Sequence, residues 1–323
     1  MSNSNQLEMM ERIALDLEGV ERALASSFNT GSEDFNTLIR PLSEAGGKRL
    51  RAQLCLLIAN AGTSVEAERI KIAEAVEMLH LATLIHDDVL DQAEIRRGEE
   101  TIHKHKGNKV AILSGDYLFA KAFRIVSEMP HMEYLKIFSH IITCLVEGEF
   151  MQMEDGYRID QGIDRYMTKT QKKTADFMEG CMELGGLLGG WSSDEIMYLK
   201  RYGHALGMAF QITDDIMDYR ETSDTTGKPV GNDLREGLLT YPLLSIVNES
   251  NQNQLLQDIK NLNHGGNEQE IIDYVIAQGG IDNTLRVAQQ YCDDALSALQ
   301  SIRDFDGKEF LVLAVQNLAD RKV

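Results

Sequence analysis

The scarcity of proline is the feature that most limits what this chain can fold into. The 323 residues include only four prolines, Pro41, Pro130, Pro229 and Pro242. Proline inside a helix removes a backbone hydrogen bond and clashes with the preceding turn, so the stretches between these prolines can hold helices of about 20 residues or more. Apolar residues recur at helical spacing in residues 70–90 and 198–219, whereas strand-type alternation is scarce. The sequence therefore predicts an all-α fold.

Length and composition favour one large helical domain over residues 1–323. Hydrophobic residues make up 43% of the chain, enough for a sizeable core, and no internal repeat, low-complexity tract or linker forces a division. The polar residues 224–237 are expected to form a lid loop. A first helix is expected at residues 7–24, and a second one follows a turn near residues 31–34 and stops around Pro41. Further helices are expected at 48–60, 65–94, 110–129, 131–156 and 164–188, with shorter helices beyond Tyr241.

The glycines and cysteines point to packing more than to chemistry. Two glycine pairs, at 185–186 and 189–190, follow no strand and lack the Lys-Ser/Thr end of a phosphate loop, so close helix packing or a helix break is the favoured interpretation. The four cysteines, Cys55, Cys144, Cys181 and Cys292, are too dispersed for a zinc knuckle or a redox pair. We expect them to be reduced and mostly buried.

Charge and hydropathy exclude several classes of partner. A formal net charge of −19 argues against nucleic acid, which a basic face would bind, but it does not exclude an anionic small substrate. No stretch approaches the roughly 18 to 20 uninterrupted apolar residues of a membrane-spanning helix, and the first residues lack a signal-peptide pattern. The chain is therefore expected in the cytoplasm, without a transmembrane segment.

Two Asp-rich motifs are the strongest functional signal. The first reads Asp87-Asp88-Val89-Leu90-Asp91 and the second Asp214-Asp215-Ile216-Met217-Asp218. At 3.6 residues per turn, the first and last carboxylates of each motif share one helix face, while the middle carboxylate lies to the side. Like charges one turn apart repel unless a cation lies between them, and hard oxygen ligands suit Mg²⁺. We expect the two motifs to face each other across a cavity and to bind Mg²⁺ there.

Basic residues stand close to these motifs in the sequence. Gly46-Gly47-Lys48-Arg49-Leu50-Arg51 places three cations at an expected helix start, where exposed backbone N–H groups add to a diphosphate site. A solvated basic turn is the alternative for this segment alone. Further cations occur in Arg96-Arg97-Gly98, in the pairs Lys169-Thr170 and Lys173-Thr174, and at Lys228 in the expected lid. Together they predict two anion sites beside a metal cluster.

These motifs, in this order, resemble those of the trans-isoprenyl diphosphate synthases, specifically the medium- to long-chain bacterial type, such as the catalytic subunits of hexaprenyl and heptaprenyl diphosphate synthases. The resemblance implies the isoprenoid synthase fold, a single large helical bundle around a central apolar cavity. Two departures are Ala52, where the family has Pro, and Glu99-Glu100, where it has Lys-Pro. The matching motifs are Gly-Gly-Lys-Arg-x-Arg at 46–51, the first Asp-rich motif with Arg96-Arg97-Gly98, Lys173-Thr174, Phe210-Gln211-x-x-Asp214-Asp215-x-x-Asp218 and Gly227-Lys228-Pro229.

The resemblance also implies a reaction and its residues. The enzyme would condense isopentenyl diphosphate with an allylic diphosphate such as farnesyl diphosphate, through a Mg²⁺-assisted allylic carbocation and with three ions when substrate is bound. The metal site would comprise Asp87, Asp88, Asp91, Asp214, Asp215 and Asp218. The allylic diphosphate would be held with Arg96, Lys173, Thr174, Gln211 and Lys228, and isopentenyl diphosphate by Lys48, Arg51, His80 and Arg97. The catalytic set would be Asp87, Asp91, Lys173, Asp214 and Lys228. Without the resemblance, His80 would be interpreted as a core histidine whose ring nitrogens are hydrogen-bonded within the protein.

Product length is expected to depend on small side chains just before the first Asp-rich motif. Ala82 and Thr83 stand about one turn before Asp87, where short-chain relatives place aromatic side chains. The channel would then continue past Leu79, at about 5.4 Å per helical turn. We therefore expect a medium- or long-chain product, as used for quinone side chains.

Other functions and assemblies remain open at this level. The alternatives are a shorter-chain farnesyl or geranylgeranyl diphosphate synthase and a non-catalytic subunit of a heteromeric synthase. A terpene cyclase is disfavoured because the second Asp-rich motif is complete. The resemblance is compatible with a homodimer or with a heteromer that includes a small accessory subunit, and with peripheral membrane contact for product release.

Overall fold

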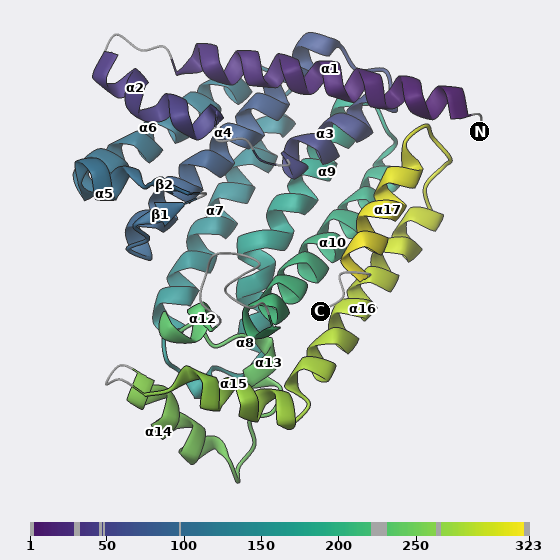
Figure 1. Cartoon of the computed structure of the whole chain (residues 1–323). Helices are drawn as coiled ribbons and strands as arrows, with labels where there is room; N and C mark the ends of the chain where they lie inside the picture. The colour runs from purple at the N-terminus through teal and green to yellow at the C-terminus, as the bar shows by residue number, and fades with distance from the viewer. Residues whose placement is uncertain are drawn as a thin grey trace. The chain divides into compact units, whose positions relative to one another are not determined.

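The computed structural model of the protein describes residues 3–28, 33–44, 47, 49–96, 98–220, 231–262 and 266–319. Helices account for most of these residues, and the strands are confined to one two-stranded hairpin (Figure 1). The predicted all-α class is confirmed. None of the helices in this described part is long and apolar enough to cross a membrane.

The helices and strands follow one another in a simple order along the chain. They are α1 Asn3–Ser27, α2 Glu33–Glu44, α3 Leu50–Asn60, α4 Glu66–Leu90, β1 Ile95–Arg96, β2 Glu99–Glu100, α5 Ile102–Lys106, α6 Asn108–Ser127, α7 Met132–Asp155, the 3₁₀ turn η1 Ile159–Gln161, α8 Gly162–Thr170, the π-helical turn η2 Gln171–Ala175, α9 Asp176–Leu188, α10 Ser193–Arg220, α12 Asn232–Arg235, α13 Tyr241–Leu244, α14 Gln252–Leu262, α15 Glu268–Ala277, α16 Gly280–Gln300 and α17 Lys308–Ala319.

The chain divides into two compact units, each assembled from three separate stretches. Unit 1 comprises Met1–His140, Gly180–Met197 and Arg303–Lys308, and unit 2 comprises Ile141–Glu179, Tyr198–Ile302 and Glu309–Val323. No single cut in the sequence separates the two units, which agrees with the lack of a linker. The single-domain assignment of residues 1–323 stays a prediction.

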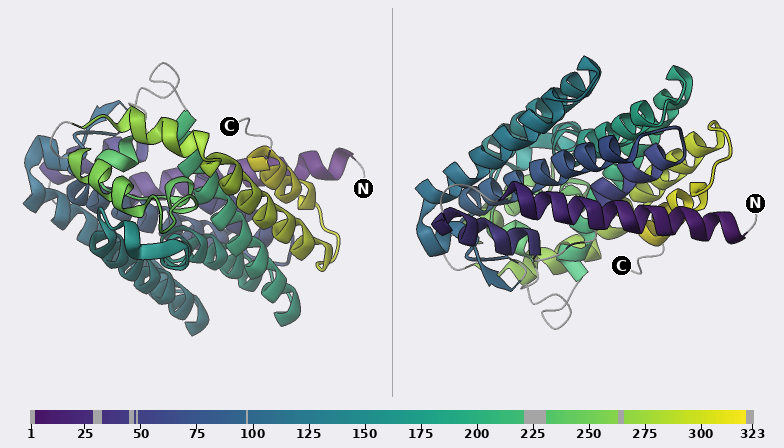
Figure 2. Two further views of the ribbon diagram at one scale, coloured as in Figure 1. Left: turned by 90° about the horizontal axis from the view of Figure 1, so that it is seen from below. Right: turned by 90° about the horizontal axis from the view of Figure 1, so that it is seen from above.

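Helix α4 is the centre of unit 1 and carries the first Asp-rich motif near its end. Its 25 residues contain neither proline nor glycine, and acidic Glu66 and Glu68 stand favourably in its first turn. Helices α1, α3 and α6 pack against it (Figure 2). Met78 and Leu79 on α4 are completely buried in this packing.

The glycine-rich end of α9 confirms the prediction of close packing. A Cβ atom added at Gly185 would lie 2.6 Å from the carbonyl oxygen of Cys55, and one added at Gly62 would lie 1.9 Å from that of Gly189. Only glycine allows backbones to approach this closely without displacement. These glycines therefore serve packing within unit 1.

Helix α10 carries the second Asp-rich motif and is fixed at both ends. It begins with a capping box, in which the Ser192 hydroxyl accepts from the Glu195 amide and the Glu195 carboxylate accepts from the Ser192 amide. Farther along, Ile212, Ile216 and Tyr219 belong to the buried core of unit 2. That core holds the motif's helix in place from its apolar side.

Three predicted boundaries differ from the structure. Helix α2 continues past Pro41 to Glu44, so the expected stop at this proline is wrong. Helix α4 ends at Leu90 rather than near residue 94, because Gln92 adopts the left-handed region with φ 52° and turns the chain into the β1–β2 hairpin. The helix expected over 164–188 is interrupted by the π-helical turn at 171–175, a feature frequent at functional sites. Of the expected lid, residues 224–230 lie outside the described residues, and Asn232–Arg235 form α12.

Candidate active site

The first Asp-rich motif presents two carboxylates one helical turn apart. The amide of Asp91 donates to the carbonyl oxygen of Asp87 at 2.8 Å, which is the last helical bond of α4. Asp87 is half-buried and Asp91 is exposed. This confirms that the two residues are separated by one turn, as their spacing predicted.

The middle carboxylate of the first motif is tied into the protein. Asp88 is only 5% exposed, and it accepts a 2.5 Å hydrogen bond from the guanidinium of Arg96 on β1. Arg96 was predicted to bind the allylic diphosphate, and here it anchors the hairpin to the end of α4. A charge-assisted bond of this kind to a buried carboxylate is a strong positional constraint.

The second motif divides its carboxylates in a similar way. Asp214 is exposed, whereas Asp215 is 3% exposed and accepts hydrogen bonds from the Tyr166 hydroxyl and, at 3.0 Å, from the Gln211 side chain. Burial raises the pKa of Asp215 to about 7, and the two hydrogen bonds oppose that rise. Asp215 therefore binds its proton far more readily than an exposed aspartate does.

Asp218 connects the motif to the chain that follows residue 230. Its two carboxylate oxygens accept from the amides of Asn232 and Asp233 at 3.0 and 3.2 Å, and burial raises its pKa. These amides open the short helix α12, so their dipoles favour the negative charge. Asp218 thus fixes the start of α12, directly after the predicted lid, to the end of α10.

Thr174 and Gln211 extend the hydrogen-bonded network of Asp215. The Thr174 hydroxyl donates to the Gln211 side-chain oxygen at 3.0 Å, and the Gln211 amide donates to Asp215. Lys173, next to Thr174 in the π-helical turn, forms an ion pair of 2.5 Å with Glu149. The structure therefore brings three predicted site residues, Thr174, Gln211 and Asp215, into one chain of hydrogen bonds.

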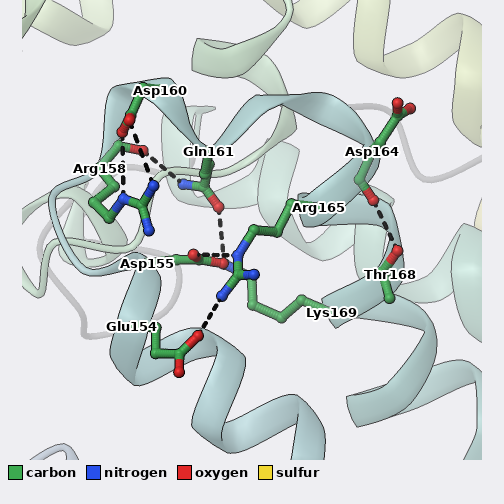
Figure 3. Close-up of polar contacts among 9 residues, drawn as sticks. All are labelled: Glu154, Asp155, Arg158, Asp160, Gln161, Asp164, Arg165, Thr168 and Lys169. Carbon is green, nitrogen blue, oxygen red and sulfur yellow. Dashed lines mark hydrogen bonds and ion pairs between the residues drawn. The ribbon is translucent and has the colours of Figure 1, made fainter.

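The earlier Lys-Thr pair at residues 169–170 has a different environment. Lys169 is 7% exposed and lies 3.4 Å from the Gln161 side chain and 3.9 Å from Asp155 (Figure 3). Arg165 bonds to the same Asp155 at 2.5 Å and to Glu154 at 2.6 Å. Lys169 thus belongs to a network that joins the end of α7 to α8, whereas Thr170 is hydrogen-bonded with Tyr166, the donor to Asp215.

Two glutamates that the sequence analysis missed hold the basic segment before α3. Arg49 lies in the left-handed region at φ 44° and forms ion pairs with Glu21 at 2.8 Å and Glu77 at 3.3 Å. Glu77 also accepts from the backbone amide of Ala52 at 3.1 Å. Glu21 and Glu77 each lie 28 residues from Arg49 in the sequence, so no local pattern links them to it.

Lys48, Arg97 and Lys228 lie outside the described residues.

Arg51 and His80, both predicted to hold isopentenyl diphosphate, lie in contact with each other. The Arg51 guanidinium approaches the His80 ring nitrogen at 3.4 Å, and burial lowers the pKa of Arg51. The predicted chain-length positions lie on the same helix as His80. Ala82 and Leu79 are completely buried, and the Thr83 hydroxyl donates to the carbonyl oxygen of His80 at 2.8 Å.

The available carboxylates fit Mg²⁺. Asp91 and Asp214 are exposed and Asp87 is half-buried, whereas the half-buried Asp218 already accepts from two backbone amides. Mg²⁺ takes one or two carboxylate oxygens and completes its shell with water and phosphate oxygens. Asp88 and Asp215 are buried against protein donors and so suit a supporting role. That the two motifs face each other across a cavity stays a prediction.

An all-α chain with two helix-borne Asp-rich motifs and nearby cations is typical of the isoprenoid synthase class. A model of the family described as Polyprenyl synthetase matches residues 32–278. The chain belongs to this family, whose members are Mg²⁺-dependent prenyltransferases.

Known proteins resemble the chain over nearly its whole length. It is 32% identical to octaprenyl diphosphate synthase of Escherichia coli K12, covering 95% of this chain and 96% of that one, and 32% identical to heptaprenyl diphosphate synthase component 2 of Geobacillus stearothermophilus, covering 89% and 90%. A geranylgeranyl pyrophosphate synthase of Lactobacillus brevis has a TM-score of 0.88 at 29% identity, covering 95% and 96%. A polyprenyl synthase of Caulobacter crescentus, solved with calcium and isoprenyl diphosphate, has a TM-score of 0.88 at 30% identity, covering 100% and 98%.

Proposed function

We propose that this prenyltransferase condenses isopentenyl diphosphate with an allylic diphosphate such as farnesyl diphosphate to make a medium- or long-chain all-trans polyprenyl diphosphate. The observation that carries the proposal is that both Asp-rich motifs are complete and keep open carboxylates at the ends of long helices. Relatives named for octaprenyl and heptaprenyl products support it. A regulatory subunit without activity would have no need of these open carboxylates.

The roles of the residues follow from their surroundings. Asp87, Asp91 and Asp214 would hold Mg²⁺, which when bound stabilises the diphosphate leaving group, and the family resemblance implies three ions with substrate. Lys173 would exchange its ion pair with Glu149 for the allylic diphosphate, and Thr174 would donate to it.

Arg51 and His80 would hold isopentenyl diphosphate together. The half-buried Arg51 offers a cation whose pKa is lowered by desolvation, and in such a poorly solvated place its attraction to a diphosphate is strong. Lys48 and Arg97, and for the allylic diphosphate Lys228, would add further cations. Arg96 would act by keeping Asp88 in place.

The decisive experiment measures products directly. Purified protein is incubated with Mg²⁺, farnesyl diphosphate and labelled isopentenyl diphosphate, and product masses are determined. Asp91→Asn should reduce turnover by about 10³-fold or more, since charge stabilisation at the reacting centre is lost. Glu94→Gln is the matched control, because Glu94 is an exposed carboxylate just beyond α4 that pairs with Lys104 at 2.5 Å. Equal turnover in Asp91→Asn and wild type would contradict the proposed metal site.

Chain length is tested by placing the same bulky side chain at two depths. Ala82 and Val76 are both completely buried on α4, six residues apart, which corresponds to about 9 Å along the helix. Ala82→Phe should give the shortest product, Val76→Phe an intermediate one and wild type the longest. Unchanged products from Ala82→Phe would show that the channel floor lies elsewhere.

Assembly is tested in the same reaction. A relative named as a second component of a heptaprenyl diphosphate synthase supports a heteromer with a small accessory subunit, and a homodimer is the alternative. Activity of the purified chain alone would establish the homomeric form. Activity only after addition of a candidate accessory subunit would establish the heteromer.

Farnesyl or geranylgeranyl diphosphate as the final product would instead establish the shorter-chain function, which the Lactobacillus brevis neighbour supports.

A further inference from the structure

A group of metal-ligating side chains lies in unit 2 outside the proposed active site. Asp176 and Glu179 come from the first turn of α9, and His204 comes from α10. One ligand atom from each of the three lies within 4.8 Å of the other two. None of these residues belongs to the Asp-rich motifs or to the residues proposed to hold substrate, so the prenyltransferase reaction does not account for their convergence.

The spacing between the ligand atoms suits one bound ion. The Glu179 carboxylate oxygen lies 3.6 Å from the Nδ1 atom of His204, which is longer than a hydrogen bond. Two ligands at about 2.1 Å from a tetrahedral Zn²⁺ are roughly 3.4 Å apart. The observed separation is therefore close to that of two atoms bound to the same ion.

Asp176 is oriented by neutral partners, as metal ligands commonly are. It is 9% exposed and accepts a 3.2 Å hydrogen bond from the Gln171 amide. The Cys144 thiol, which is 4% exposed, also hydrogen-bonds to it. Lys172 lies nearby but forms its ion pair with Glu147 at 2.6 Å. Within the part of the chain that the structure describes, no ion pair reaches Asp176.

A simple salt bridge explains only part of this arrangement. Lys200 lies 3.4 Å from Glu179 and forms an ion pair with it. Lys200 pairs with Glu179 and Lys172 with Glu147, so neither ion pair neutralises the buried Asp176. The Lys200 side chain is 34% exposed and can swing into solvent when a cation of higher charge occupies the group.

We propose that Asp176, Glu179 and His204 form a binding site for a divalent transition-metal ion, of which Zn²⁺ is the probe. One imidazole nitrogen with two carboxylate oxygens suits Zn²⁺, while Mg²⁺ prefers an all-oxygen shell. The bound ion would tie α9 to α10 within unit 2. These helices follow Thr174 and carry Asp214 respectively, so the site would stiffen the support of the second Asp-rich motif without touching substrate.

The test measures zinc binding rather than catalysis. Chelator-treated protein is titrated with Zn²⁺ in excess Mg²⁺ by calorimetry, and bound metal is counted by mass spectrometry after dialysis. Wild type should hold one Zn²⁺ per chain, and Asp214→Asn should match it. His204→Gln and Asp176→Asn should each bind roughly 100-fold more weakly or worse, because loss of a residue that only hydrogen-bonds to a metal ligand already costs about 10- to 100-fold. His105→Gln, which changes an exposed histidine, is the matched control.

Lys200→Met separates the metal site from a salt bridge. Removing the competing cation should leave Zn²⁺ binding as tight as in wild type or tighter. Circular dichroism checks that each variant is folded, and the visible absorption of Co²⁺ reports the imidazole ligand directly, because loss of nitrogen changes the ligand field. Equal Zn²⁺ affinity in wild type and folded His204→Gln would overturn the proposal, as would loss of binding in folded Lys200→Met.

Discussion

Asp215→Asn tests whether the buried carboxyl of the second motif stays protonated in the metal-free protein. Asp215 is 3% exposed, and burial raises its pKa from an ordinary value of 3.8 to about 7. Asparagine has a similar shape but cannot ionise. The substitution therefore removes the cost of keeping a proton, or of burying a charge, at this position.

The raised pKa of Asp215 determines whether the free energy of unfolding rises or falls with pH. A carboxyl that binds its proton more tightly in the folded state stabilises most below the unfolded pKa of about 4, and this stability is lost as pH rises through about 7. The difference between 3.8 and about 7 corresponds to roughly 4 kcal/mol in the free energy of unfolding, at about 1.4 kcal/mol per pH unit. Between pH 5 and pH 8, wild type should lose about 3 kcal/mol relative to Asp215→Asn.

Urea unfolding in magnesium-free buffer, followed by circular dichroism at several pH values, measures this difference. Asparagine also needs an acceptor for its amide, but that penalty does not vary with pH, so the slope is diagnostic. Asp218 and Asp233 are present in both proteins, and their contributions largely cancel. Asp194→Asn, which changes an exposed carboxylate in the first turn of α10, should follow the wild-type slope. A pH-independent difference between wild type and Asp215→Asn would refute the reasoning.

Three further substitutions test the supports of the site by the same unfolding assay. Tyr166→Phe removes the donor to Asp215 and should cost about 1–3 kcal/mol, more at pH 8 than at pH 5, because the bond to the ionised form is stronger. Arg49→Ala leaves Glu77, 1% exposed, without this cation and should cost about 3–5 kcal/mol, whereas a loss below about 1 kcal/mol would mean that the pair is dispensable. Gly185→Ala places a Cβ 2.6 Å from an α3 carbonyl oxygen and should cost about 1–3 kcal/mol, and an unchanged midpoint would contradict the close packing.

The sequence predicts the helices better than it predicts their interruptions. Proline-free stretches with apolar residues at helical spacing predicted α4 and α10 correctly, because helical propensity and a buried apolar face both favour a helix there over many turns. The end of α4 depends on Gln92 adopting a left-handed conformation, which glycine or asparagine would have signalled but glutamine does not. The π-helical turn at 171–175 leaves the residue pattern almost unchanged, so periodicity does not reveal it.

The candidate site was predictable in its motifs but not in its supports. The spacing of the Asp-rich motifs and the order of the cationic segments are local features of the chain. The partners Glu77 for Arg49 and Tyr166 for Asp215 lie 28 and 49 residues away, and only the folded chain brings them together. A single sequence carries no signal for such pairs, because the local sequence around each residue is that of an ordinary helix.

The spacing within each Asp-rich motif explains why its carboxylates differ in environment. Neighbouring residues on a helix point about 100° apart, so when Asp214 faces solvent, Asp215 turns toward the core. The same step separates Asp87 from the buried Asp88. In both motifs the inward carboxylate bonds to a residue of another element, Arg96 on β1 or Tyr166 on α8. The inward residue thus fixes the helix rotation that presents the outward one, and replacing it should weaken Mg²⁺ binding even though it need not touch the ion.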